Sequence, residues 1–278
     1  MCPMAPTTLD TVKANGMTIA YRELGSGPPV LLLHGWPTSS FLWRNVMVPI
    51  ARANRVVAVD LPGFGASDKP LGVDYDFDLF ETTLDEFLAA LEIDEVALAV
   101  HDLGGPVGVH WAVQRPERVT RLALLNTLLY PDFSEAVMAF IKACTEPELR
   151  EQLTSPAGLE FAMGLGLADE ATLTEEVVAA VREPFADDDA RLALANAGIG
   201  LPIEGFAEIE RLLPSLKVPV RIVYGERDRI LPDVAETMAR VKKDLPQAEV
   251  TALPDCGHFL QEEAPERIGE ELARFFAA

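Results

Sequence analysis

The chain contains few cysteines, and their spacing gives no sign of a disulfide framework or a zinc site. Only 3 occur among 278 residues, at Cys2, Cys144 and Cys256, without a CxxC or CxH pattern. Disulfide-rich secreted domains and zinc-binding modules both need characteristic cysteine spacings. We therefore expect a protein of a reducing, cytoplasmic compartment that binds no metal.

Positive charge is scarce as well. The sequence has 23 lysines and arginines against 44 aspartates and glutamates, a formal net charge of -21. This excess repels nucleic-acid phosphates and anionic lipid surfaces, so neither nucleic acid nor a membrane is an expected partner. Residues 1–10 lack the basic and apolar stretches of a signal peptide, and no apolar run is long enough to span a bilayer. The remaining class is a soluble globular protein, and nothing in the sequence indicates its oligomeric state.

Short apolar runs alternate with helical stretches along most of the chain. In the stretch Phe77–Leu91, for example, apolar residues recur every three or four positions, which is the helical period. Near-continuous apolar strands that alternate with helices predict a mostly parallel sheet covered on both faces. The weaker opening stretch, Thr11–Leu24, is predicted as an antiparallel hairpin at the sheet edge. The predicted parallel strands are Pro28–Leu33, Arg55–Asp60, Glu95–His101, Arg121–Asn126, Val220–Tyr224 and Ala248–Leu253.

The pattern changes in residues 130–213, where no strand-like run occurs. This segment is rich in alanine, leucine, glutamate and methionine, and it predicts several helices interrupted at Pro147, Pro156, Pro184 and Pro202. The simplest architecture is one α/β core, formed by residues 1–129 and 214–278, with a helical insertion between its two parts. An amphipathic helix over Pro265–Phe276 closes the chain.

The sequence around Asp102 predicts the reactive centre. Val100–Gly105 (VHDLGG) ends a predicted strand and opens a helix, which is the arrangement of a nucleophile elbow with aspartate in the position usually held by serine. The alternative is that Asp102 only caps the following helix. Asp228 and His258 each follow a later predicted strand, and the order nucleophile, acid, histidine favours the elbow.

With these motifs the sequence resembles the α/β-hydrolase superfamily, and within it the aspartate-nucleophile group of haloalkane dehalogenases and epoxide hydrolases. The resemblance covers the whole predicted core and implies an α/β-hydrolase fold, a mostly parallel central sheet flanked by helices, with a helical cap inserted after the sixth strand. The residues that carry it are His34–Ser40 (HGWPTSS), Leu42–Arg44 (LWR), Asp60–Pro70 (DLPGFGASDKP), Asp102, Asp228 and Gly257–His258.

An aspartate suits this chemistry because a carboxylate is ionised at neutral pH and its alkyl ester can be hydrolysed, whereas a serine would leave an ether. The resemblance implies that Asp102 attacks carbon, His258 activates water and Asp228 orients His258. It assigns the oxyanion hole to the backbone N–H groups of Trp36 and Leu103. The expected function is hydrolytic dehalogenation of a small neutral haloalkane to an alcohol and halide, with no cofactor.

The residues that would hold the leaving group depart from both subfamilies. Haloalkane dehalogenases usually carry tryptophan directly after the nucleophile and asparagine after His-Gly, where this chain has Leu103 and Trp36. Epoxide hydrolases use two cap tyrosines, and only Tyr130 lies at the edge of the insertion. Trp36 and Tyr130 are therefore the candidate leaving-group or substrate contacts, although a packing role fits Trp36 equally.

Two alternatives to dehalogenation stay open: epoxide hydrolysis to a diol, and a ligand-binding or receptor-like member of the fold. His101 is expected to order the elbow, and His110 to be a core histidine. The large apolar residues of the insertion are expected either to line an apolar pocket or to form an ordinary interface with the core. These residues are Phe133, Met138, Phe140, Phe161, Met163 and Phe185.

Overall fold

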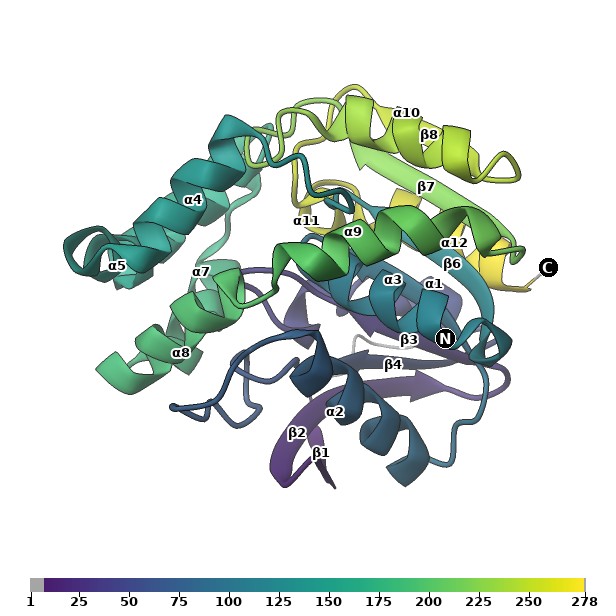
Figure 1. Ribbon diagram of the computed structural model, residues 1–278, viewed down its shortest axis with the longest axis horizontal. Coiled ribbons are helices and arrows are strands. Elements are labelled where there is room, and N and C mark those ends of the chain that lie inside the picture. Colours follow the sequence, from purple (N-terminus) through teal and green to yellow (C-terminus); the bar gives the residue numbers. More distant parts are fainter. Residues whose placement is uncertain (1–7, 278) are drawn as a thin grey trace.

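An eight-stranded sheet forms the centre of the molecule, with strand order β1-β2-β4-β3-β5-β6-β7-β8 (Figure 1). The structure is a computed structural model and describes residues 8–277. Strands β3 to β8 pair in parallel, while β2 pairs antiparallel with both β1 and β4, which confirms the predicted edge hairpin. The strands are β1 Asp10–Ala14, β2 Met17–Gly25, β3 Pro29–Leu33, β4 Arg55–Val59, β5 Val96–His101, β6 Val119–Leu125, β7 Val220–Gly225 and β8 Glu249–Leu253.

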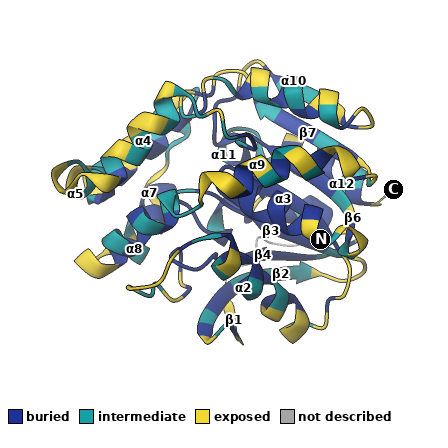
Figure 2. Ribbon diagram, viewed as in Figure 1, coloured by how far each residue is buried: buried dark blue, intermediate teal, exposed yellow. Residues whose placement is uncertain are grey.

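The parallel strands lie where the apolar runs predicted them, within two residues at each end. All six residues of β5 are buried, as are the last four of β3 and β4. Strands this apolar are stable only when helices cover both faces of the sheet, because either face would otherwise expose leucine and valine to water. Figure 2 shows the result as a buried sheet inside a shell of partly exposed helices.

Helices of the core cover both faces of this sheet. Helices α1 and α12 pack against each other, and α2 packs against α3 (Figure 1). The Asp76 side chain caps α2 by accepting a hydrogen bond from the Leu79 N–H, which satisfies one of the free donors at a helix start. The core helices are α1 Met47–Ile50, α2 Phe77–Ala90, α3 Gly104–Gln114, α10 Val234–Asp244, α11 Leu260–Glu263 and α12 Pro265–Ala277, with 3₁₀ turns η1 Ser40–Trp43 and η2 Pro116–Arg118.

The helical insertion lies between β6, the sixth strand, and β7, as expected. Pro147 and Pro156 begin α5 and α6, Pro184 lies in the short η4, and Pro202 precedes α9. Proline suits the first turn of a helix, where the missing N–H would have no intrahelical partner. The insertion comprises α4 Glu135–Thr145, α5 Pro147–Thr154, α6 Pro156–Gly166, η3 Glu170–Thr172, α7 Glu175–Arg182, η4 Glu183–Phe185, α8 Asp188–Ile199, α9 Ile203–Leu212 and η5 Leu213–Ser215.

Some predictions concern residues that the structure does not describe. Cys2 and most of the stretch analysed for a signal peptide lie outside the described residues, whereas Cys144 and Cys256 are buried free thiols. Within residues 8–277, no individual helix combines the length and apolar character needed to cross a membrane. The bent pair Asp188–Ile199 and Ile203–Ser215 meets both requirements only when its two helices are taken together.

Candidate active site

Asp102 lies at a sharp turn between β5 and α3. Its φ angle is +50°, in the left-handed region that residues other than glycine rarely adopt. Hydrogen bonds hold this turn on both sides: the Asp102 N–H donates to the Asn126 carbonyl (3.0 Å), and the Thr127 hydroxyl donates to the Asp102 carbonyl (2.6 Å). Leu103, not Asp102, is the N-cap residue of α3. The strand, turn and helix therefore have the arrangement of the predicted elbow.

Close packing around the elbow explains the small residues near it. A Cβ atom on Gly35 would lie 2.2 Å from Asp102 Oδ1, so only glycine leaves room for this carboxylate. Val100 occupies a position where the motif usually has glycine. Room for its side chain comes from Gly108 on the facing helix α3. A Cβ atom on Gly108 of α3 would lie 2.7 Å from Val100 Cγ1. The departure at Val100 is thus accommodated by a glycine on the helix that faces it.

The Asp102 carboxylate is fixed by the two backbone donors that the sequence predicted. The Trp36 N–H donates to Asp102 Oδ1 at 2.7 Å, and the Leu103 N–H also donates to the carboxylate. Burial raises the pKa of Asp102 above its ordinary value, while the nearby His258 charge and these N–H groups oppose the rise. The Asp102 carboxylate is therefore buried, with two backbone N–H groups donating to it.

His258 and Asp228 form a buried, hydrogen-bonded pair beside Asp102. His258 Nδ1 lies 2.8 Å from Asp228 Oδ2, and both side chains are fully buried. On the other side of the ring, His258 Nε2 lies 3.6 Å from Asp102 Oδ2 and has no hydrogen-bond partner. Burial acts to lower the pKa of His258, but the Asp228 charge and hydrogen bond, helped by Asp102, outweigh it and raise the pKa. The structure thus brings the three predicted catalytic residues together.

Asn126, to which the sequence assigned no role, holds the Asp228 carboxylate. Its amide nitrogen donates to Asp228 Oδ2 at 2.7 Å, and its amide oxygen accepts from the Gly225 N–H at 2.9 Å. Asp228 Oδ1 also accepts from the N–H groups of Ile230 and Leu231, both at 2.8 Å. Burial acts to raise the pKa of Asp228, but His258, Asn126 and the Leu231 N–H together lower it. Asp228 is therefore held as a carboxylate in one orientation.

His101 holds the backbone of His258 instead of the elbow itself. Its Nε2 lies 2.9 Å from the His258 carbonyl, so Nε2 carries a proton and donates it. Burial, helped by the proximity of His258, holds the pKa of His101 well below its ordinary value. His110 lies apart from this group, as expected, between Glu81 and Glu208 and stacked on Phe77.

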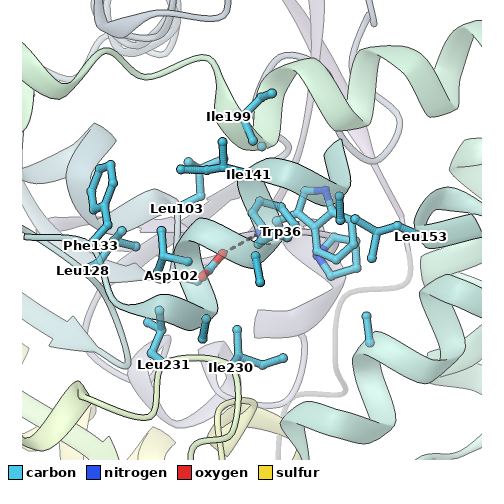
Figure 3. Close-up of a pocket in the computed structure, with 18 of the residues that line it drawn as sticks. Trp36, Asp102, Leu103, Leu128, Phe133, Ile141, Leu153, Ile199, Ile230 and Leu231 are labelled. Atoms are coloured by element: carbon cyan, nitrogen blue, oxygen red, sulfur yellow. Dashed lines mark hydrogen bonds between the residues drawn. The ribbon is translucent and has the colours of Figure 1, made fainter. Parts of the chain in front are cut away.

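A cavity of about 320 Å³ opens beside Asp102 and is lined almost entirely by apolar side chains (Figure 3). It lies between the core and the insertion, as residues of α3, α4, α6, α8 and α9 all contribute to its wall. Of the six large apolar residues of the insertion that the sequence singled out, Phe133, Phe140 and Phe161 line this cavity. Its volume and apolar lining suit a small neutral ligand.

Comparison with known proteins assigns the chain to a family. A sequence model of the α/β hydrolase fold matches residues 28–265. A haloalkane dehalogenase of Sphingobium indicum is 31% identical over 289 residues, covering 95% of this chain and 93% of that protein. The chain belongs to the α/β-hydrolase family, in its haloalkane dehalogenase group.

Other members of the family agree in sequence and in structure. Haloalkane dehalogenase 2 of Mycobacterium tuberculosis is 29% identical, over 93% of this chain and 91% of that protein. The crystal structure of haloalkane dehalogenase DbeA from Bradyrhizobium elkani gives a TM-score of 0.85 at 29% identity, over 97% of each chain. The resemblance found in the sequence, the fold and the hydrolase class are thereby confirmed.

The two candidate leaving-group contacts of this haloalkane dehalogenase homologue differ in position. Trp36 lines the cavity, and its indole Nε1 is buried without a hydrogen-bond partner. Tyr130 is not among the residues that line this cavity, and its hydroxyl donates to Asp244 at 2.8 Å. Arg240 also stacks on the Tyr130 ring. Residues of α10 thus provide partners for the hydroxyl and the ring of Tyr130.

Within the described residues, no three histidine, cysteine, aspartate or glutamate side chains form a group that could hold a metal ion. The polar or charged side chains that line the cavity are Asp102, Trp36 and Arg229.

Proposed function

We propose that this chain hydrolyses small neutral haloalkanes to an alcohol and halide through a covalent ester on Asp102. The observation that carries the proposal is the position of the Asp102 carboxylate, at the wall of an apolar cavity and beside the unpartnered Nε2 of His258. The dehalogenase relatives support the reaction class. They do not favour epoxide hydrolysis, and the hydroxyl of Tyr130, the one tyrosine at the edge of the insertion, donates to Asp244.

In the first step, an Asp102 oxygen attacks the carbon that bears the halogen. A C–O bond forms, the carbon–halogen bond breaks, and the halide leaves with the bonding electron pair. The Trp36 indole N–H is buried in the cavity wall without a partner, so it can donate a hydrogen bond to the departing halide. The attacking group is the Asp102 carboxylate anion, to which the Trp36 and Leu103 N–H groups donate, so no base is needed for this step.

In the second step, water attacks the carbonyl carbon of the ester. His258 Nε2 accepts a proton from this water, and Asp228 stabilises the imidazolium through the hydrogen bond to Nδ1. The Trp36 and Leu103 N–H groups, which now hold the carboxylate, can stabilise the negative oxygen of the tetrahedral intermediate. Collapse of the intermediate breaks the bond between the carbonyl carbon and the alkoxy oxygen, and the departing alcohol takes up the proton held by His258. The acid proton left on Asp102 is released to solvent, which restores the carboxylate.

The test is a panel of chloro-, bromo- and iodoalkanes and of epoxides, with halide, alcohol and diol measured for the wild type and for Asp102→Ala and His258→Ala. The wild type should release halide and alcohol from haloalkanes. Asp102→Ala should release neither, while His258→Ala should release one halide per protein and gain the mass of the alkyl group. A folded wild-type protein that releases no halide from any haloalkane would contradict the proposal, as would halide release by Asp102→Ala.

A further inference from the structure

One segment of the insertion contacts the loop that carries His258. We call residues 164–169, the end of α6 and the turn after it, the docking segment. The His258 N–H donates to the carbonyl of Gly166 in this segment at 2.7 Å. Since the His258 carbonyl is already bound by His101, both polar groups of the His258 backbone are held, one by the core and one by the insertion.

Glu263 of α11 bridges the docking segment and the His258 loop. Its Oε1 accepts hydrogen bonds from the N–H groups of Ala168 (2.7 Å) and Asp169 (3.3 Å), and its Oε2 accepts from the Gly257 N–H (2.6 Å). An ionised carboxylate offers only acceptors, on both of its oxygens, which matches the three N–H donors around Glu263. One side chain thus binds the residue before His258 and the docking segment together.

Arg229 makes a second connection to the docking segment. Its Nη2 donates to the Leu167 carbonyl at 2.6 Å and to the Gly164 carbonyl at 3.1 Å. Arg229 directly follows Asp228, so the loops of both members of the histidine–aspartate pair are attached to the same six residues of the insertion.

We propose that Glu263 is a positioning residue for His258, and that it makes hydrolysis of the ester depend on docking of the segment 164–169. The proposal rests on the proposed function. Ester formation does not use His258, and the donors that hold Asp102 come from Trp36 and Leu103. Water activation does use His258, so loss of Glu263 should slow the second step and spare the first.

The Glu263 carboxylate also affects the protonation of His258. The charged groups around His258 are Asp228, Asp102 and Glu263, and all three favour its protonated form. Burial raises the pKa of Glu263, as does nearby Asp169, while the three backbone donors oppose the rise. Replacing Glu263 by a neutral residue should therefore lower the pKa of His258, so that the hydrolysis rate rises at lower pH than in the wild type. Loss of positioning should in addition lower the maximum rate that is reached at higher pH.

The experiment compares Glu263→Gln with Glu266→Gln, which removes an equal charge from an exposed position three residues further along the chain, in α12. Glutamine offers one acceptor and places an N–H₂ group against backbone donors, so it cannot replace the bridge. For Glu263→Gln we expect an unchanged burst of halide and a steady-state rate lower by on the order of 10- to 100-fold, with the alkyl adduct accumulating on the protein. Glu266→Gln should behave like the wild type.

Hydrogen exchange gives a second measurement that does not depend on activity. The amides of Gly257, His258 and Ala168 should exchange faster in Glu263→Gln than in Glu266→Gln, because the bridge that protects them is lost. Equal exchange in the two variants would overturn the proposal, as would equal slowing of the burst and of the steady state. A wild type that releases no halide at all would instead contradict the proposed function, and the exchange result would still decide the role of Glu263.

Discussion

Replacing Asn126 by leucine should destabilise the fold and slow ester hydrolysis together. Asn126 is fully buried, and its amide joins Asp228 to the end of β7 at Gly225. The Asn126 amide nitrogen also donates to the Gly257 carbonyl at 3.3 Å. Leucine has a similar size and no polar atoms, so the substitution removes all three hydrogen bonds with little change in packed volume. Asp228 keeps its other donors but loses the one that shares its Oδ2 with His258.

The size of the effect follows from the three lost hydrogen bonds. A hydrogen bond to a charged group contributes about 1.5–3 kcal/mol, and a buried N–H left without an acceptor costs about 1–3 kcal/mol. Better burial of the leucine side chain offsets part of this sum, so the free energy of unfolding should fall by about 3 kcal/mol. For a chain of this size that corresponds to a melting temperature lower by roughly 6–12 °C.

Asn54→Leu provides a matched control. Asn54 is also buried, but its amide nitrogen donates only to the Pro28 carbonyl at 3.2 Å, and its amide oxygen has no partner. Removing an unsatisfied oxygen relieves a desolvation cost, so the free energy of unfolding should change by only about 0–1 kcal/mol. Urea unfolding followed by circular dichroism, with halide assays on the same samples, measures both variants. Equal destabilisation of the two variants, or wild-type turnover in Asn126→Leu, would refute the reasoning.

Three further predictions concern the site itself. Trp36→Phe keeps an aromatic ring and removes the indole N–H, so the halide burst should slow by about tenfold, more for chloroalkanes than for bromoalkanes, as rapid-quench measurements would show. The steady-state rate should rise with pH through a value above 6.5, because the raised pKa of His258 keeps it protonated and unable to accept a proton below that point. The stability that protonated His258 contributes is complete below its unfolded pKa and lost as pH rises through its folded pKa, as urea titrations at several pH values can test. Gly35→Ala places a Cβ atom 2.2 Å from Asp102 Oδ1 and should abolish halide release. Gly164→Ala, whose Cβ atom meets nothing closer than 3.8 Å, should not.

The strands, the insertion and the order of the site residues could be predicted because each depends on local pattern. Apolar runs of five or six residues specify buried parallel strands, and prolines mark the starts of α5 and α6. Because polar residues at the carboxyl ends of parallel strands meet at one edge of the sheet, chain order was enough to bring Asp102, Asp228 and His258 together.

The connections between these residues could not be predicted, because they depend on packing between distant segments. Asn126 and Asp228 are 102 positions apart, and Glu263 and Ala168 are 95 apart. A signal for Asn126 did exist, since it follows a predicted strand at the same edge as Asp102. For Tyr130, its position at the edge of the insertion suggested a contact with substrate. Its hydroxyl instead donates a hydrogen bond to Asp244 of α10, a contact that the sequence did not indicate.

The central claim is that Asp102 supplies the oxygen of the first alcohol formed. The most direct test is a single turnover in water labelled with the heavy oxygen isotope, with protein in excess over a bromoalkane. The account predicts that the alcohol from this turnover contains ordinary oxygen, and that the heavy isotope appears in the peptide that contains Asp102. Heavy oxygen in the alcohol of the first turnover, with none in that peptide, would show direct displacement by water and contradict the account.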